Sequence, residues 1–227
     1  MNTQIRFGVD LISNGEIENA LKHFDLMVES NPIDHLAIYY VGLCHLKQDK
    51  VSTSILHFNR ALELAPNTAN YLSDRAVAKL RANDSQGSMS DLNKAVELEP
   101  SNSYRYSLRA FVRNSFGDTE GAIVDYTKAI ELDPEDAIAL NNLGMAEESQ
   151  GYKSSAQRRF EQADALSGIS KKTSDHTIKF KENSTPQDET SESFYWSTIL
   201  SVFTDSKQRE EFIKFTFSLL RGKTNKG

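Results

Sequence analysis

The chain has 227 residues, of which 38% are apolar and 26% are charged, a balance typical of a soluble folded protein. The formal net charge of −6 argues against a nucleic-acid partner, because phosphate binding needs clustered Lys and Arg. The single cysteine, Cys44, excludes an intrachain disulfide and favours a reducing compartment.

The start of the chain, MNTQIRFGVDLISNGE, is polar and already has helical periodicity, so we do not expect a secretory signal there. The longest nearly apolar stretch, FYWSTILSVF at residues 194–203, is about half as long as a membrane-spanning helix. We therefore expect a cytoplasmic protein.

An internal repeat organises most of the sequence. Four of the five prolines lie 34 residues apart, at Pro32, Pro66, Pro100 and Pro134. This spacing defines five units, at residues 1–34, 35–68, 69–102, 103–136 and 137–170. Each unit has the pattern of two amphipathic helices joined by a short turn, and such a hairpin must stack on its neighbours to bury its apolar face.

Equivalent positions of the five units carry the same kinds of residue. Position 8 is small: Gly8, Gly42, Ala76, Ala110 and Gly144. Position 24 is large and apolar or aromatic: Phe24, Phe58, Leu92, Tyr126 and Phe160. Position 15 has residues that tolerate a left-handed turn: Gly15, Asp49, Asn83, Gly117 and Gly151. Position 34 has residues that cap a helix: Asp34, Thr68, Asn102, Asp136 and Ser170.

This pattern resembles the tetratricopeptide repeat over residues 1 to about 168. The resemblance implies an all-α fold: a right-handed α-solenoid of five helix-turn-helix repeats of 34 residues, with additional C-terminal helices. We divide the chain into a repeat domain at 1–170, a flexible linker at 171–191 and an amphipathic helical segment at 192–222.

The third and fourth units differ from the others in a correlated way. Position 7 is arginine in these two units, where the other units have an apolar residue, and position 23 is aspartate in the same two units. We predict an ion pair between the two helices of each unit, with a second cation nearby: Arg75–Asp91 with Lys79, and Arg109–Asp125 with Arg113. The alternative is a basic anion-binding site.

The sequence shows no constellation of catalytic or ligand-binding residues. His23 and His57 occupy the same repeat position, and none of the five histidines has Cys, Asp or Glu at a metal-ligand spacing. Cys44 and His45 are adjacent on one helix and point in different directions, and no glycine-rich phosphate loop is present. We expect no enzyme activity, no cofactor and no metal.

The resemblance implies that first-helix side chains line a groove that holds a partner peptide. Carried over to this chain, that groove comprises Ile5, Val9, Leu36, Tyr39, Tyr40, Leu43, Asn70, Asp74, Val77, Tyr104, Leu108, Phe111, Asn141, Asn142 and Met145. The Lys, Arg and Asn set with which some family members hold chaperone carboxylates is absent. The groove suits an apolar or amphipathic segment.

The composition changes after Ser170. Residues 171–191 are rich in Ser, Thr, Lys and Glu, whereas residues 192–222 return to helical patterning. The apolar surface of this tail comprises Trp196, Ile199, Leu200, Phe203, Phe212 and Phe215. Residues 1–170 hold 16 basic and 24 acidic residues (−8), and residues 171–227 hold 10 and 8 (+2).

We therefore interpret the chain as a non-catalytic scaffold that binds a protein or peptide partner in its groove, with regulation by its own tail. The alternative is an assembly or membrane-surface adaptor that works through the C-terminal helices. Docking of the tail on the repeats and self-association both stay open, and of the two kinds of partner we favour a protein over a membrane surface.

Overall fold

The structure is a computed structural model that describes residues 3–167. The chain divides into two units, Met1–Ala163 and Asp164–Gly227, so the described residues up to Ala163 belong to the first. The described residues form α-helices without any strand, with the following bounds: α1 Thr3–Ser13, α2 Ile17–Ser30, α3 His35–Lys47, α4 Val51–Leu64, α5 Ala69–Arg81, α6 Ser85–Leu98, α7 Ser103–Ser115, α8 Thr119–Leu132, α9 Ala137–Ser149 and α10 Lys153–Leu166.

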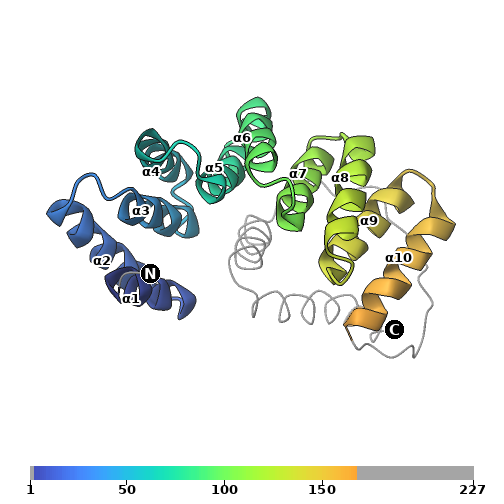
Figure 1. The fold of residues 1–227 in the computed structure, drawn as a ribbon, viewed down its shortest axis with the longest axis horizontal. Helices are drawn as coiled ribbons and strands as arrows, with labels where there is room; N and C mark the ends of the chain where they lie inside the picture. Colours follow the sequence, from blue (N-terminus) through green and yellow to red (C-terminus); the bar gives the residue numbers. More distant parts are fainter. Residues whose placement is uncertain (1–2, 168–227) are drawn as a thin grey trace, which may run out of the picture. The chain divides into compact units, whose positions relative to one another are not determined.

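The helices form consecutive hairpins, each with a first and a second helix (Figure 1). Within a hairpin the two helices pack together, as α3 does with α4, and each second helix then packs on the first helix of the next hairpin, as α4 does on α5. The second helices begin 34 residues apart, at Ile17, Val51, Ser85, Thr119 and Lys153. The prediction of an all-helical solenoid is confirmed.

The turn between the two helices of each hairpin uses one left-handed residue. The predicted turn position has positive φ in all five units, including the two that are not glycine, with φ of 63° at Asp49 and 58° at Asn83. Asp and Asn tolerate this conformation better than most other residues because their short polar side chains form local hydrogen bonds. The prediction from the repeated turn position is confirmed.

Small residues allow the two helices of a hairpin to approach closely. A Cβ atom added to Gly8 would lie 2.3 Å from the Phe24 ring, and one added to Gly42 would lie 2.9 Å from the Phe58 ring. Both phenylalanine side chains are completely buried. Glycine in the first helix therefore makes room for the large ring of the second.

Side-chain caps fix several helix starts. Asp34 accepts hydrogen bonds from the backbone N–H groups of Leu36 and Ala37, and Asp136 caps α9 in the same way. Asn102 caps α7, whereas Thr68 makes no side-chain cap at α5. The predicted cap Ser170 lies outside the described residues.

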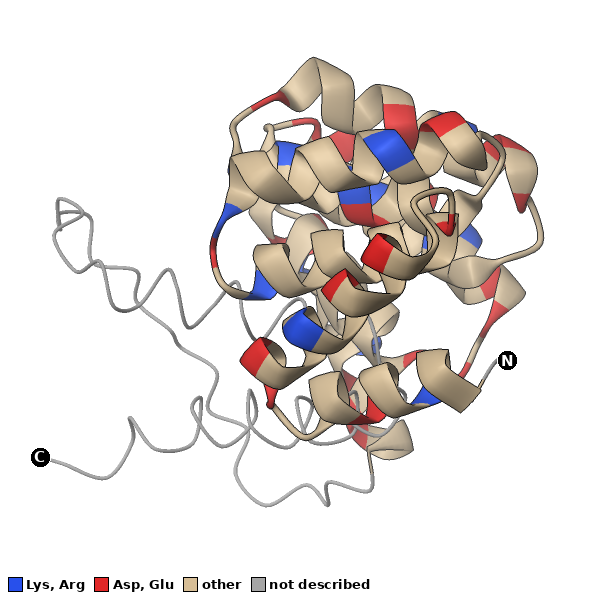
Figure 2. Cartoon of the chain, turned by 90° about the vertical axis from the view of Figure 1, so that its left-hand side faces the viewer, with Lys and Arg blue, Asp and Glu red and all other residues tan. Residues whose placement is uncertain are grey.

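The predicted ion pairs are confirmed in both units. Arg75 donates to both carboxylate oxygens of Asp91, at 2.8 and 2.6 Å, and Lys79 lies 2.8 Å from the same carboxylate. Arg109 forms the same bidentate contact with Asp125, at 2.8 and 2.7 Å. Figure 2 shows basic and acidic positions interspersed along the helices. The arginines are paired within their own hairpins, which favours a structural role.

The same place in the hairpin holds different pairs in different units. Where the fourth unit has Arg113 beside Asp125, the fifth has the charges reversed, with Glu147 3.8 Å from Arg159. The second unit has two histidines there, His45 and His57, with ring centroids 5.3 Å apart. The units thus occupy the same position between their two helices with different side chains: an ion pair, an ion pair of reversed order, or two histidines.

The linker 171–191 and the segment 192–222, including the six apolar tail residues, lie outside the described residues, so these predictions stay predictions. Among residues 3–167 no helix is long and apolar enough to cross a membrane.

Candidate functional site

The first helices α3, α5, α7 and α9 lie next to one another along the array (Figure 1). We name their shared surface the first-helix face. Tyr39 of α3 shows how neighbours meet: its ring stacks on Tyr71 of α5, with centroids 4.3 Å apart, and its hydroxyl donates a hydrogen bond to Asp74. The residues that the family resemblance places in a groove belong to α1 and to these four helices.

Nine of the fifteen expected groove residues are partly or fully exposed: Val9, Leu36, Tyr40, Asn70, Tyr104, Phe111, Asn141, Asn142 and Met145. The other six are buried: Ile5, Tyr39, Leu43, Asp74, Val77 and Leu108. The buried six differ from our expectation of an open lining. Tyr39, for example, packs against Tyr71 of the next first helix and donates a hydrogen bond to Asp74.

A buried acid lies at the centre of the first-helix face. Burial raises the pKa of Asp74 to about 6, and the hydrogen bond from Tyr39 and the charges of Arg105 and Lys47 oppose this rise. Burial also raises the pKa of the Tyr39 hydroxyl well above its usual value, so Tyr39 stays a donor at neutral pH. The negative charge of Asp74 is thus partly compensated by the positive charges of Arg105 and Lys47.

Arg105 of α7 connects three groups around this centre. Its guanidinium donates to Ser73 Oγ at 2.9 Å, to Asn70 Oδ1, and to a carboxylate oxygen of Glu99 at 2.8 Å. Only 3% of the residue is exposed. Sequence reasoning missed this residue. The signal was available, because the same repeat position holds Ala37, Tyr71 and Ala139 in the other described units beyond the first.

The α7–α9 end of the face has neutral polar groups with spare hydrogen-bonding capacity. Ser107 Oγ is buried and has no hydrogen-bond partner. The Asn141 amide makes one weak contact, with the Met145 sulfur at 3.7 Å, and Asn142 lies beside it, half-buried. Amide groups of this kind can donate to and accept from a peptide backbone.

The single cysteine, Cys44, is buried. Burial raises the pKa of the Cys44 thiol to about 12, so it is protonated at neutral pH. Within residues 3–167 no three His, Cys, Asp or Glu side chains lie close enough together to hold a metal ion.

Comparisons with known proteins agree with this architecture. A tetratricopeptide repeat family model matches residues 5–69, and a TPR repeat model matches residues 112–151. A comparison with curated proteins finds no match. The chain therefore contains tetratricopeptide repeats in these two ranges.

Solved structures with the same fold include three that differ in source. MamA from Desulfovibrio magneticus RS-1 is 19% identical, with a TM-score of 0.63 over 73% of this chain and 96% of that one. TTC0263, a thermophilic TPR protein of Thermus thermophilus, is 21% identical, with a TM-score of 0.61 over 72% and 89%. YrrB, described as a TPR protein with an unusual peptide-binding site, is 20% identical, with a TM-score of 0.57 over 72% and 84%. At these identities the likeness shows the fold.

Proposed function

We propose that this protein is an interaction module that binds a segment of a partner polypeptide on its first-helix face. The observation that carries the proposal is the division of that face into a buried, internally paired centre and an exposed lining that is aromatic, aliphatic or amide. A surface of this kind is pre-formed, because its central side chains are already held in place. The peptide-binding site named for YrrB adds support by analogy of fold.

The lining favours a partner segment without a strong charge. The charged groups at the centre, Asp74 and Arg105, are buried and already have partners. The exposed residues beside them are neutral, as at Tyr40, Asn142 and Met145. An anionic terminus would find few unpaired cations, whereas an apolar side chain flanked by peptide groups would find both contacts and hydrogen bonds.

The tail adds a regulatory element to the same proposal. Residues 192–222 have an amphipathic sequence pattern with apolar residues on one side. The preceding residues, 171–191, contain few large apolar residues that could pack against that side. We extend the proposal to competition between this segment and the partner for the protein. Its test is the affinity of a partner peptide for the full chain and for a chain ending at Ser170, which rises on truncation if the tail competes.

A random dodecapeptide library selected on the full chain tests the proposal. We expect enriched peptides that share an apolar or aromatic residue and bind in about the micromolar range. Met145→Ser and Asn142→Ala should each weaken their binding about tenfold, because both side chains lie on the first-helix face. Ile33→Ser is the matched control, since Ile33 is 67% exposed in the turn after α2 and Met145 is 56% exposed.

Selected peptides that bind all three variants equally would place recognition elsewhere. A selection that yields no family of related peptides would contradict the proposal itself.

A further inference from the structure

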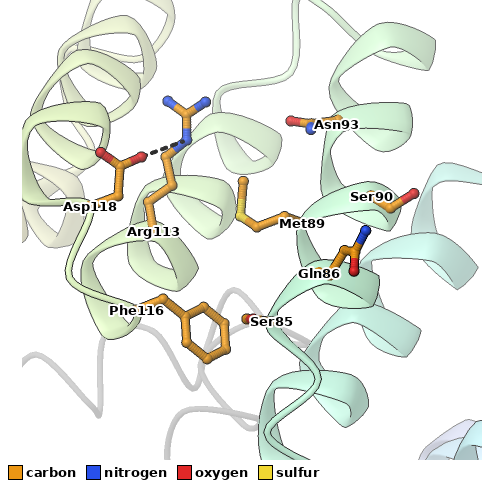
Figure 3. A pocket seen from close by; sticks show the side chains of 8 residues that line it. All are labelled: Ser85, Gln86, Met89, Ser90, Asn93, Arg113, Phe116 and Asp118. Carbon is orange, nitrogen blue, oxygen red and sulfur yellow. Dashed lines mark ion pairs between the residues drawn. The ribbon is translucent and has the colours of Figure 1, made fainter.

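A cavity of about 490 Å³ opens between α6 and the end of α7 (Figure 3). Met89 of α6 and Phe116 at the end of α7 project into the same space from its two walls. Ser90 and Gln86 line the α6 wall, and Arg113 and Asp118 lie together across from them, 3.6 Å apart. The lining thus combines two large apolar side chains, Met89 and Phe116, with polar and charged ones.

The phenylalanine in this cavity is not explained by the packing of the repeat. Phe116 stands at position 14 of its unit, and the other units have Asn14, Gln48, Ala82 and Gln150 there. The hairpin turn therefore forms equally well with small or polar residues. Phe116 is nevertheless 38% exposed, which leaves a large aromatic surface in contact with water. A ligand that covers the ring would recover this apolar area.

Exposed apolar residues flank the cavity on the neighbouring second helices. Leu56 of α4 is 67% exposed and Val124 of α8 is 65% exposed, and both occupy position 22 of their units. Ser90, which lines the cavity, occupies the same position on α6 between them. Because equivalent repeat positions lie on the same side of each second helix, Leu56, the cavity and Val124 form one row, which we name the second-helix row.

One helical turn further along, the same helices carry cations. Position 26 holds Arg60, Lys94 and Lys128, which are all exposed. Arg60 and Lys128 make ion pairs at 2.9 Å with glutamates three residues on, in each case with both side chains well exposed. Exposed pairs of this kind contribute little, so an incoming carboxylate can replace the glutamate. A basic stripe thus runs beside the apolar second-helix row.

The surface of α6 around the cavity carries no other charge. Between Ser85 and Asn93 the only ionisable side chain is Asp91, which is buried and paired with Arg75 and Lys79. The middle of the row therefore suits an uncharged apolar anchor, and the flank suits an acidic one. This combination distinguishes the second-helix row from the neutral first-helix face.

We infer that the second-helix row binds an amphipathic α-helix of a second protein, which has apolar residues along one face and acidic residues along the flank that meets Arg60, Lys94 and Lys128. The apolar face of this helix covers Leu56, the cavity and Val124 in turn. Its central apolar residue, inserted between Met89 and Phe116, is the largest on that face.

A designed peptide tests this inference on the full chain. The peptide is helical and rich in alanine, with a central tryptophan, leucines on the same face on both sides of it, and glutamate along one flank. With ¹³C-labelled methionine methyl groups, Met89 reports on the cavity and Met145 reports on the first-helix face. We expect the Met89 resonance to shift during the titration and the Met145 resonance to stay in place, so the outcome is separate from that of the proposed function.

Variants of the row give the expected losses. Ser90→Lys places a charge at the rim of the cavity and should weaken binding at least tenfold, and Leu56→Ser and Val124→Ser should each weaken it about tenfold. Ile33→Ser is the matched control: Ile33 is also 67% exposed but lies in the turn after α2, and its replacement should leave the affinity unchanged.

Three results would overturn the inference. An unchanged Met89 resonance at about 1 mM peptide would exclude binding at the cavity. Equal affinity of a peptide with lysine in place of glutamate would remove the role of the basic stripe. Equal affinity of a peptide whose helix is broken by a central proline would show that binding to the row does not require a helical partner.

Discussion

His45 lies against His57, with ring centroids 5.3 Å apart, at the place where the third unit has Lys79 beside Asp91. Burial lowers the pKa of both imidazoles, and Lys50 lowers that of His45 further, whereas Asp25 opposes both shifts. His45 in turn lowers the pKa of His57. A contact between two neutral rings thus replaces the ion pair of the next unit.

The histidine pair should make stability depend on pH. A histidine whose pKa is lower in the folded than in the unfolded protein binds fewer protons when folded, so the free energy of unfolding falls as the pH drops below about 6.5. Replacing the pair by His45→Lys with His57→Asp should reduce this loss. Urea midpoints at pH 7.5 and 5.5 measure it, and an equal pH dependence of both proteins would contradict the assignment.

Asp74 should act in the opposite direction. Its folded pKa of about 6 lies above its usual value of 3.8, so its stabilising contribution is present at low pH and is lost as the pH rises through about 6. Asp74→Asn keeps an acceptor for the Tyr39 hydroxyl and cannot ionise. We expect the variant to gain stability relative to the natural chain between pH 5 and pH 8, measured by urea unfolding. No relative change would show that Asp74 is not buried as described.

Removing the acid of a paired cluster should cost more than removing an exposed one. Asp91→Ala leaves Arg75 and Lys79 together without their carboxylate, and we expect a loss of about 3–5 kcal/mol in the free energy of unfolding. Glu63→Ala is the control, because its pair with Arg60 is exposed and should be worth less than about 1 kcal/mol. Similar losses in the two variants would contradict the structural role of Asp91.

The glycines of the first helices should be matched to the size of the facing side chain. Gly42→Ala places a methyl group 2.9 Å from the Phe58 ring and should cost about 1–3 kcal/mol. The third unit already combines Ala76 with Leu92 at these two positions. The double change Gly42→Ala with Phe58→Leu should therefore cost less than the sum of the single changes. Additive losses in thermal or urea unfolding would argue against direct contact.

The boundaries of the repeats could be predicted from the sequence because each hairpin requires the same kinds of residue at the same positions. Three features can be recognised at fixed positions of the repeat. They are a residue that tolerates a left-handed turn, a small residue opposite a large one, and an arginine that appears together with an aspartate. The structure confirms all three features: Asp49 has positive φ, Gly42 lies close to the Phe58 ring, and Arg75 pairs with Asp91. Such features depend on contacts within one unit. Because the chain repeats this unit five times, the residue at each position can be compared among five units.

The surface between units was harder to predict because it depends on how closely neighbouring helices approach. Tyr39 and Leu108 have the pattern of groove residues, yet both are buried, and Tyr39 packs against Tyr71 of the next first helix. Arg105 of the fourth unit binds Asn70, Ser73 and Glu99, which all belong to the third unit, so the pattern within its own unit does not predict it. The cavity beside Phe116 likewise forms between two hairpins, and its only sequence signal is an aromatic residue at a turn position that is polar or small elsewhere.

The most direct test of the central claim is hydrogen exchange of the full chain with and without a saturating library-selected peptide. The account predicts slower exchange in α7 and α9, with little change in α4, α6 and α8, because the peptide covers the first-helix face. Protection confined to α4, α6 and α8 would contradict it and would place recognition of that peptide on the second helices.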